Sequence, residues 1–503
     1  MSNNMNSISK YVIVGGGTTG WIAACVLANQ FRDQACSIQL IESDQIGTIG
    51  VGESTIPPFL ELLQSLNIDE VDFIKKTQAS FKLGIEFNDW RVKGESYFHP
   101  FGSITAGMDE YSFYQLWLKK QRQNNLPGLQ SFSINSVMAQ QQKFFMPQQG
   151  QTPLADSRYA LHLDATLVAK YLKNYALEAG VVRTEGKLVD VYQANKHITK
   201  VTLDNGAEIR GDFFIDCTGF NALLIDKHMG VKYIDWSQYL PCDRAVVAQT
   251  KGPTEITPNT KASASDAGWI WRIPLQTRVG NGYVYASEYC TDEEAKATLL
   301  AQLDGELLTE PRVIHFKTGM REQVWQGNCL SLGLASGFIE PLESTAIHLV
   351  VRGMVHFMRN LPNKKCQAAL RNEFNRRIRM DYEEIRDFIV LHYCLTQRED
   401  TPFWRYCKSM ALPDSLQHTL DYFKASGSLP EQMDPLFSPV SWRSVCEGMG
   451  FSPESHSPLV NSQDNHQLTE QLQDYAESLT NFVEQLPSHT DFIQHHCAST
   501  AEH

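Results

Sequence analysis

Apolar and polar positions alternate in blocks along the first part of the chain. Residues 11–14 and 38–41 are apolar runs of strand length, and residues 21–31, between them, have a helical pattern. Short apolar runs of this kind are typical of strands buried on both faces of a parallel sheet. The strand–helix–strand order therefore predicts an α/β fold.

A glycine-rich segment joins the first predicted strand to the helix. It has the spacing Gly-x-Gly-x-x-Gly, and Glu42 follows the second strand about twenty residues later. The glycines allow the backbone to approach a pyrophosphate at the helix N-terminus, and the acid accepts hydrogen bonds from a ribose. This context predicts a nucleotide cofactor rather than a bare glycine-rich turn. The residues expected to bind it here are Gly15, Gly16, Gly17, Thr18, Thr19, Gly20 and Glu42.

Two later features indicate which nucleotide cofactor is bound. A second irregular loop, residues 47–57, has three glycines within six residues, where backbone can contact a ligand. A hairpin with Asn205 and Gly206 at its turn then leads to an apolar run that ends at Asp216, followed by Gly219. A hairpin excursion that returns to the sheet at an acid and a glycine is common in FAD-binding folds. NAD enzymes usually lack it, so the sequence favours FAD.

Residues 81–87 alternate strictly between apolar and polar positions. This pattern predicts one strand with two different faces. Phe81, Leu83, Ile85 and Phe87 share the apolar face, and Lys82 lies on the other. From the alternation alone, Lys82 is a solvated lysine on an exposed sheet face.

Two carboxylates lie close to another predicted strand–helix junction. The apolar run 330–334 predicts a buried strand and an apolar stretch begins at Ala346, with Glu340 and Glu343 between them. Free N–H groups at a helix start stabilise an anion, and a carboxylate can remove a proton. Alternatively, both acids only cap the helix. These residues alone leave both interpretations open.

The pattern changes in the rest of the chain. An aromatic-rich insertion covers about residues 94–160, and residues 346–422 and 468–486 are largely helical in pattern. We therefore predict an FAD-binding core at residues 1–350 that contains the inserted substrate-binding region. A mostly helical region at residues 351–503 is expected to pack on the core and complete the substrate pocket.

Composition excludes several classes of function. The chain has 503 residues and a net charge of −13, without a basic block, which argues against nucleic acid as a partner. No signal peptide is predicted at the start, and no apolar run reaches the ~18 residues of a membrane span. Eleven scattered cysteines without a Cys-x-x-Cys pair argue for reduced thiols rather than disulfides or a metal site. We expect a cytoplasmic protein.

Together these segments resemble the flavin-dependent tryptophan halogenases over about residues 9–495. The resemblance includes the glycine-rich fingerprint with Trp21, the loop at residues 50–57, Lys82, and the segments at residues 216–220, 340–345 and 401–404. The Trp-x-Trp-x-Ile-Pro run at residues 269–274 is the most specific signal. It separates halogenases from related flavin monooxygenases.

The resemblance implies a fold and a reaction. The fold is an FAD-binding Rossmann-type core like that of flavin monooxygenases. A separate flavin reductase supplies FADH2, which gives hypohalous acid with O2 and chloride or bromide. The oxidant passes through a tunnel to Lys82, which delivers it to an indole-like aromatic substrate. Glu343 assists by steering the oxidant, or by stabilising the cationic adduct and taking its proton.

The resemblance also assigns residues to each part of this site. Besides the fingerprint, the cofactor would contact Gly50, Val51, Glu53, Ser54, Thr55, Leu188, Asp216, Gly219, Gly333, Leu334 and Ile347. The halide would bind the backbone amides of Thr345 and Ala346. The tunnel would include Trp269, Trp271, Ile273, Pro274 and Ser344. The substrate ring would contact His99, Phe101 and Trp442, and no metal is implied.

Two positions depart from the family pattern. Ala346 stands where the family usually has glycine, which keeps the N–H group but adds a methyl beside the halide. The tyrosine pair that holds the amino-acid end of tryptophan is missing near Trp442, whereas His99 and Phe101 remain. The ring pocket is therefore kept and the amino-acid clamp is lost, so indole, a related heteroaromatic or a peptide-bound tryptophan fits better than free tryptophan.

Two other functions compete with halogenation. A flavin monooxygenase that hydroxylates an aromatic substrate would need the substrate beside the flavin, against which Trp269 and Trp271 argue. A non-catalytic flavoprotein that acts as a binding partner predicts a damaged catalytic pair, yet Lys82 and Glu343 are both present. A homodimer is compatible with the sequence, which does not identify the natural substrate, the halide or the reductase.

Overall fold

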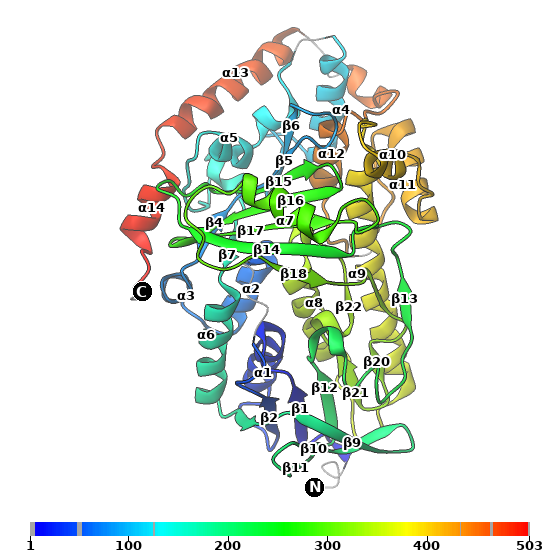
Figure 1. Cartoon of the computed structure of the whole chain (residues 1–503). Coiled ribbons are helices and arrows are strands. Elements are labelled where there is room, and N and C mark those ends of the chain that lie inside the picture. The colour runs from blue at the N-terminus through cyan, green and yellow to red at the C-terminus, as the bar shows by residue number, and fades with distance from the viewer. Residues whose placement is uncertain (1–5, 48–52, 124–125, 433, 463–465, 501–503) are drawn as a thin grey trace. The chain divides into compact units, whose positions relative to one another are not determined.

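The protein is described by a computed structural model, which covers residues 6–47, 53–123, 126–432, 434–462 and 466–500 (Figure 1). The chain forms two compact units. The first unit comprises Met1–Thr77, Leu163–Ser237 and Phe316–Glu383, and the second comprises Gln78–His162, Gln238–His315 and Glu384–His503. Residue 350, where the sequence placed the end of the core, lies inside a helix of the first unit, so the units do not follow that division.

A six-stranded sheet forms the centre of the first unit. Its order is β20-β21-β12-β1-β2-β8, and all neighbours are parallel except the edge strand β20. The strands are β1 (Lys10–Val14), β2 (Ser37–Glu42), β8 (Val182–Glu185), β12 (Phe213–Asp216), β20 (Trp325–Gln326) and β21 (Cys329–Ser331). The predicted parallel α/β core is confirmed.

Helices pack on this sheet and begin where its strands end. Helix α1 (Thr18–Gln30) follows β1 and contacts α6 (Ala165–Glu178) and α8 (Ala346–Arg359). Asp164 caps α6 as expected, because its side chain accepts hydrogen bonds from the N–H groups of Thr166 and Leu167. Val12, Val14 and Phe214 belong to the buried core of this unit.

Smaller elements complete the first unit. Two three-stranded sheets have the orders β11-β10-β9 and β13-β19-β22. Gly206, at φ +83°, makes the predicted turn between β10 and β11. The remaining elements are β3 (Glu53–Ser54), α2 (Pro58–Ser65), α3 (Glu70–Thr77), β9 (Leu188–Ala194), β10 (His197–Leu203), β11 (Glu208–Arg210), β13 (Tyr233–Asp235), β19 (Gly319–Arg321) and β22 (Gly337–Phe338).

A seven-stranded sheet forms the second unit, in the order β18-β14-β17-β16-β15-β5-β6. Its neighbours are antiparallel except β15 and β5. The strands are β5 (Gly84–Asn88), β6 (Ser96–Pro100), β14 (Arg244–Lys251), β15 (Thr260–Ser265), β16 (Gly268–Pro274), β17 (Arg278–Tyr285) and β18 (Arg312–His315). Strand β16 carries the Trp-x-Trp-x-Ile-Pro run, and β6 is an edge strand of the sheet.

The prediction of one continuous strand at residues 81–87 is wrong. The chain forms β4 (Ser80–Lys82), which pairs with β7 (Ala160–Leu163), and then β5, which pairs with β6 and β15. The break falls at Leu83, whose N–H donates to the carbonyl of Pro258 at 2.7 Å. Because the chain changes partners there, alternation along residues 81–87 does not define one exposed face.

Helices dominate the last part of the chain, as the sequence predicted. Beyond Ala346, the regular elements of the described residues are all helical, and α9 (Ala368–Cys394) belongs to the first unit up to Glu383. In the second unit the helices are α4 (Glu110–Gln121), α5 (Ile134–Gln140), α7 (Asp292–Ala301), α10 (Pro402–Ser409), α11 (Asp414–Ser426), α12 (Pro439–Gly448), α13 (His466–Glu484) and α14 (His489–His496). In the part of the chain that the structure describes, none of the helices has the length and apolarity needed to cross a bilayer.

Candidate active site

The glycine-rich turn of the first unit leaves room only for backbone. Gly15 has φ +114°, and a Cβ there would lie 2.2 Å from the carbonyl oxygen of Cys217. A Cβ at Gly16 would lie 1.7 Å from Oε2 of Glu42, and one at Gly20 would lie 1.9 Å from the Gly15 carbonyl. Gly17 caps α1 without a side chain and faces open space. The N–H groups at the start of α1 therefore face an approach that suits a phosphate.

Glu42 lies at the end of β2, next to this turn. Its Oε1 accepts hydrogen bonds from Nζ of Lys173 at 2.7 Å and from Nε of Arg183 at 2.5 Å. A carboxylate has about four acceptor positions, so the Glu42 side chain keeps acceptor capacity after both cations are bound. The ion pairs hold it in one orientation at the edge of the glycine turn.

Glu53 is a second carboxylate with unused hydrogen-bonding capacity. Its Oε2 is buried and has no hydrogen-bond partner among the described residues. Burial, and then the nearby charge of Asp164, raise the pKa of Glu53 to about 7. Ser54 and Thr55 follow it, whereas Gly50 and Val51 lie outside the described residues. An orphaned buried oxygen at this position fits a polar ligand that is not part of the protein.

The turn after β12 is held by its own acid. The Asp216 carboxylate accepts hydrogen bonds from N and Oγ1 of Thr218 and from the N–H groups of Leu224 and Ile225. Burial raises the pKa of Asp216 in spite of these donors. The carboxylate thus fixes the loop that contains Gly219, at φ +66°. Its hydrogen-bonding capacity is used within the protein.

Another glycine brings a distant segment to the start of α1. Gly333 has φ +60°, and a Cβ there would lie 2.5 Å from Oγ1 of Thr19. The strand predicted at residues 330–334 is therefore shorter, because β21 ends at Ser331 and Gly333–Ala335 forms a 3₁₀ turn. Leu334 is half-buried and Ile347 is buried in α8, while Leu188 begins β9. The blocked Cβ positions, the open helix start and the orphaned Glu53 oxygen together fit a dinucleotide such as FAD.

The acids that precede α8 are buried, and neither is the N-cap residue of that helix. Glu340 and Glu343 are 0% and 1% exposed, and Glu343 ends a 3₁₀ helix, Pro341–Glu343. Thr345 is the N-cap of α8 and makes no side-chain cap bond, and the first turn of α8 has no acid. The helix-capping interpretation therefore does not account for the burial of Glu343.

Backbone strain marks the same segment. Ser344 has φ +61°, a left-handed conformation that non-glycine residues seldom adopt. Such residues are found where the surrounding structure enforces them, often next to functional groups. The turn at Ser344 directs the chain from Glu343 into the N-terminus of α8, where Thr345 is buried and Ala346 is exposed. A carboxylate and the free N–H groups of a helix start are thus close neighbours in the first unit.

Lys82 belongs to the second unit and is fully buried. Its residue exposure is 0%, so the expectation of a solvated lysine is wrong. The Phe101 ring centroid lies 5.1 Å from Nζ of Lys82. The two residues are brought together because the N–H of Phe101 donates to the carbonyl of Leu83 at 2.9 Å. A buried lysine beneath an aromatic ring is unusual for a purely structural residue.

A polar chain connects the lysine strand to the Trp-x-Trp-x-Ile-Pro strand. Oγ of Ser80 donates to the carbonyl of Pro274 at 2.5 Å and lies 3.1 Å from Nδ1 of His162. Nε2 of His162 lies 3.0 Å from Oγ1 of Thr260. Burial, and then the charge of Lys82, lower the pKa of His162 well below its usual range. The imidazole is therefore neutral and adds no second positive charge.

His489 holds the same strand from the C-terminal helix α14. Its Nδ1 donates to the carbonyl of Ile256 at 2.8 Å, and its Nε2 accepts from the N–H of Phe81 at 3.3 Å. The contact with Phe81 requires the neutral imidazole, because a proton on Nε2 would face the Phe81 N–H. Burial lowers the pKa of His489 to about 4. Its distance of 408 residues from Phe81 explains why sequence patterns did not identify it.

A chain of aromatic rings leads away from β6. The His99 ring lies 5.6 Å from Phe388, which stacks on Phe437 at 3.8 Å and meets Trp442 edge-on at 5.1 Å. Phe437 and Trp442 line a cavity of about 430 Å³. Two of the three predicted ring contacts, His99 and Trp442, are thus connected through Phe388. No sequence signal distinguished Phe388 from other core aromatics of α9.

One ion pair borders this cavity. The Arg443 guanidinium contacts Oε1 of Glu110 at 3.0 Å and lies over the Tyr114 ring at 4.5 Å. Arg443 is 5% exposed, and burial lowers its pKa while the Glu110 charge acts in the opposite direction. The charges of Arg443 and Glu110 are paired within the protein, Glu431 is a further acid in the lining, and most of the other lining residues are apolar. This composition suits an uncharged aromatic ligand.

The two tryptophans of β16 are buried and adjacent. The ring centroids of Trp269 and Trp271 are 6.0 Å apart. Trp271 lies opposite Gly282 of β17, and a Cβ at Gly282 would lie 2.1 Å from the Trp271 ring. Nε1 of Trp271 is buried without a hydrogen-bond partner among the described residues. Ile273 and Pro274 continue the strand and are buried as well. The strand thus offers a wall of large rings with one unused donor.

The two units divide the predicted site between them. The described cofactor residues, Glu343, Ser344 and the halide residues belong to the first unit. Lys82, the substrate residues and the four tunnel residues of β16 belong to the second. Each half is internally consistent with its predicted role.

Comparisons with known proteins identify the family to which the chain is similar. A model of the tryptophan halogenase family matches residues 10–465. Tryptophan 6-halogenase SttH from Streptomyces toxytricini is 31% identical, over 97% of this chain and 98% of that protein. The solved structure of Xcc4156, a flavin-dependent halogenase from Xanthomonas campestris, is 39% identical with a TM-score of 0.94, over 99% and 100% of the two chains. The solved structure of BrvH, a flavin-dependent halogenase from Brevundimonas sp. BAL3, is 37% identical with a TM-score of 0.93. The match covers 97% of this chain and 99% of that chain.

The neutral His489 predicts a pH dependence of stability. Its pKa of about 4 in the folded protein lies below the ordinary value of 6.5, so the unfolded chain binds the proton more readily. The stabilisation is complete above about pH 6.5 and is lost as pH falls towards 4, by up to about 3 kcal/mol. Urea unfolding between pH 7 and 4.5 measures it. His489→Gln should show a shallower decline, and exposed His495→Gln on the same helix should follow the wild type. Equal slopes for all three proteins would contradict the assignment.

Proposed function

The chain belongs to the tryptophan halogenase family, and we propose that Lys82 and Glu343 carry out the halogen transfer. It is a flavin-dependent halogenase that uses FADH2 and chloride or bromide, with a flavin reductase as the source of reduced cofactor. FAD, when bound and reduced, supplies the chemistry that converts O2 and halide into hypohalous acid. Hydroxylation of the substrate and a purely structural role have no support among these relatives.

The observation that carries the proposal is the buried Lys82 beneath the Phe101 ring. Burial of an amine is costly unless function or a partner requires it. The strand that holds Lys82 is fixed on both sides, by His489 through Phe81 and by Pro258 through Leu83. We propose that this rigidity aims the amine at the substrate.

Lys82 would act on hypohalous acid in one of two ways. An ammonium donates a hydrogen bond and polarises the oxidant, whereas a free amine takes up the halogen and releases water. In both cases the aromatic carbon forms a bond to the halogen, and the bond between the halogen and oxygen or nitrogen breaks. The ring then carries positive charge until it loses a proton.

Glu343 would accept that proton or stabilise the positive ring. Its burial strengthens its interaction with a nearby charge, because a low-dielectric surrounding screens it little. The halide would bind at the N–H groups of Thr345 and Ala346 at the start of α8, where an anion is stabilised. Ser344 would direct the oxidant from this end of the tunnel.

The cofactor would be held by the first unit. The turn at Gly15, Gly16 and Gly20 would receive the pyrophosphate, and Glu42 and Glu53 would accept hydrogen bonds from the ribose or ring. We propose that Asp216 acts through the loop it holds at Gly219. The other assigned contacts are Gly17, Thr18, Thr19, Gly50, Val51, Ser54, Thr55, Leu188, Gly333, Leu334 and Ile347.

The strand β16 would separate the substrate from the cofactor. Trp269 and Trp271 would form a wall that excludes a second aromatic ring but admits a molecule as small as hypohalous acid. The unused N–H of Trp271 offers that molecule a hydrogen bond, with Ile273 and Pro274 continuing the passage. The connection from Pro274 through Ser80 to the lysine strand supports a path that ends at Lys82.

The substrate that fits best is a neutral indole. His99, Phe101 and Trp442 offer rings, and Phe388 and Phe437 extend the aromatic surface towards the cavity. Arg443 forms an ion pair with Glu110, so its charge is already balanced and does not need a carboxylate from a ligand. The helices α9 and α12, together with β6, would complete this pocket. We propose a cytoplasmic location because none of the eleven cysteines forms a disulfide within the described residues, and a homodimer stays a prediction.

Lys82→Ala should abolish halogenation while FAD binding and formation of hypohalous acid persist. The substitution removes the amine that delivers the halogen but leaves the first unit unchanged. A coupled assay with flavin reductase, NADH, bromide and indole measures the product, and a diffusible 1,3-diketone measures escaped oxidant. Lys82→Met tests the charge at nearly constant volume, and exposed Lys93→Ala is the control. Near-normal halogenation by either Lys82 variant would disprove the role.

Glu343→Gln should lower the halogenation rate by about 10²-fold, the usual scale for one acid–base group. The amide keeps the shape but cannot take the ring proton. The melting temperature should change little, because shape and helix propensity are nearly conserved. Exposed Glu322→Gln serves as the control. A lower melting temperature together with an unchanged rate would assign Glu343 a structural role.

Indole and neutral 3-substituted indoles should be halogenated faster than free L-tryptophan. An ammonium and a carboxylate lose water on entering the pocket, which costs several kcal/mol without equivalent partners. A neutral indole avoids this loss and keeps a stacking contribution of about 1 kcal/mol per aromatic pair. Competition between indole and L-tryptophan in one vessel, followed by mass spectrometry, decides the question. Preferential conversion of tryptophan at a single benzo-ring carbon would show that the protein contains an amino-acid clamp.

A further inference from the structure

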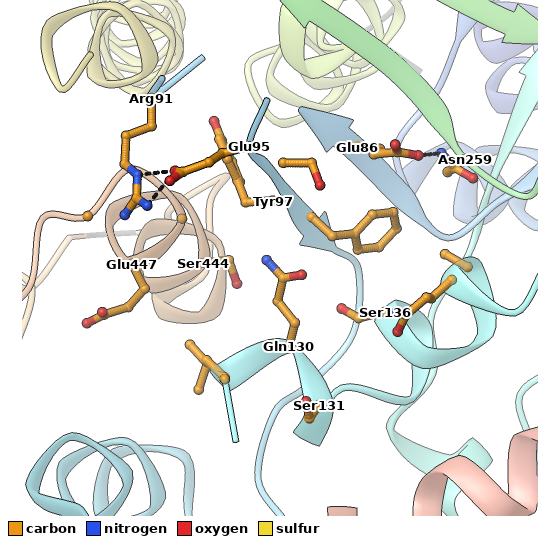
Figure 2. A pocket seen from close by; sticks show the side chains of 18 of the residues that line it. Glu86, Arg91, Glu95, Tyr97, Gln130, Ser131, Ser136, Asn259, Ser444 and Glu447 are labelled. Carbon is orange, nitrogen blue, oxygen red and sulfur yellow. Dashed lines mark hydrogen bonds and ion pairs between the residues drawn. The ribbon is translucent and has the colours of Figure 1, made fainter. Parts of the chain in front are cut away.

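A second, larger cavity follows the edge strand β6 in the second unit (Figure 2). Its volume is about 900 Å³, and we call it the β6 slot. The slot is bordered by β6 and by residues of α12, α5 and the 3₁₀ helix Leu129–Phe132. Helix α12 packs closely on β6, since a Cβ at Gly448 would lie 2.4 Å from the Tyr97 ring. A slot between an edge strand and a helix has the shape of known peptide grooves.

The register of β5 and β6 determines which backbone groups face the slot. Asp89 donates to the carbonyl of Glu95, and Phe101 donates to the carbonyl of Leu83. Hydrogen-bonded and non-hydrogen-bonded pairs alternate along antiparallel strands. The intervening pairs, Asn88 with Ser96 and Glu86 with Phe98, are therefore of the non-hydrogen-bonded kind.

The backbone of Ser96 and Phe98 consequently points away from β5. Both residues line the slot. Neither has a hydrogen bond on that side to any residue within the described ranges. An edge with unpaired N–H and C=O groups accepts a further strand, which is the liability that most proteins cover. Here the uncovered backbone borders the slot, with Ser96 exposed and Phe98 buried.

Side chains on the slot walls also have unused hydrogen-bonding capacity. Ser136 of α5 and Ser444 of α12 are only 6% and 3% exposed, and the hydroxyl of each has no partner in the part of the chain described. A rotation about χ1 turns either hydroxyl towards a ligand at small cost. Gln130 extends into the middle of the slot between them (Figure 2). Buried polar groups in native proteins are nearly always paired, so these two hydroxyls leave unused hydrogen-bonding capacity beside the slot.

The charges around the slot are largely paired with protein groups. Arg91 is bound to Glu95, Glu86 accepts a hydrogen bond from Asn259 at 3.0 Å, and Glu447 accepts from two hydroxyls. Figure 2 shows the first two of these contacts at the rim. The interior therefore offers hydroxyls, amides and unpaired backbone rather than net charge. Its complement is a neutral ligand that alternates donors and acceptors along its length.

We propose that the β6 slot binds an extended peptide segment with neutral polar side chains as an added strand on β6. The peptide N–H and C=O groups would pair with Ser96 and Phe98, and its hydroxyl or amide side chains would meet Ser136, Ser444 and Gln130. A strand as long as β6 measures about 17 Å. The proposal is independent of the roles of Lys82 and Glu343.

The test uses the full-length protein and a defined probe. Seven-residue peptides with Ser, Thr, Asn or Gln at each position are selected on immobilised protein and identified by mass spectrometry. A selected peptide, labelled with fluorescein, should bind with a dissociation constant below about 1 mM, the weak end of specific recognition. N-methylation of the alternate residues whose amides face β6 should weaken binding at least tenfold. Methylation of the other set should change it less than twofold, because those amides face away.

Two substitutions locate the binding. Gln130→Trp fills the slot and should weaken binding at least tenfold, while Gln193→Trp on exposed β9 should have no effect. Ser96→Pro removes one outward N–H group from the edge strand, where proline is tolerated, and should weaken binding several-fold. Unchanged halogenation of indole by Gln130→Trp shows that the variant is folded. Failure to enrich any peptide, equal effects of the two methylation patterns, or undiminished binding by Gln130→Trp would each overturn the proposal.

Discussion

The burial of the Lys82 amine is the constraint around which the second unit is organised. A buried amine excludes other positive charges from its surroundings, since desolvation and repulsion would add. The two nearby histidines satisfy this condition, because His162 and His489 are both held neutral by burial. Their hydrogen bonds fix the strand on which the lysine lies. The positioning of the amine and the electrostatics around it therefore have one structural origin.

The first unit has a different proposed task, the binding of negative charge. Close approach of backbone at Gly15, Gly16 and Gly20 opens the positive end of α1, and the start of α8 offers another set of free N–H groups. The carboxylate of Glu343 lies immediately before α8 and is followed by the strained Ser344. This arrangement suits the proposed pairing of a base with a site for an anion, and a plain helix cap would not require it.

The proposed substrate region combines rigid aromatic rings with few charges. Phe388 links His99 to Phe437 and Trp442, so the ring surface extends over segments from three different parts of the chain. The charges of Arg443 and Glu110 balance each other in an ion pair. On another side of β6, the strand edge and two buried hydroxyls form a polar slot of a different character. One strand thus borders an aromatic site and a hydrogen-bonding site.

The sequence alone determined the parts that depend on local chemistry. The glycine spacing from Gly15 to Gly20, the acid at Glu42 and the hairpin turn at Gly206 could be predicted from short segments, because the φ angles that glycine permits are a local property. The tertiary structure decided what depends on distant neighbours. It buried Lys82, which alternation placed on a solvated face, and ended its strand at Leu83 by changing the pairing partner. Only the tertiary structure identified the contacts of Phe388 and His489, because packing and hydrogen bonds between residues hundreds of positions apart leave no periodic signal in the sequence.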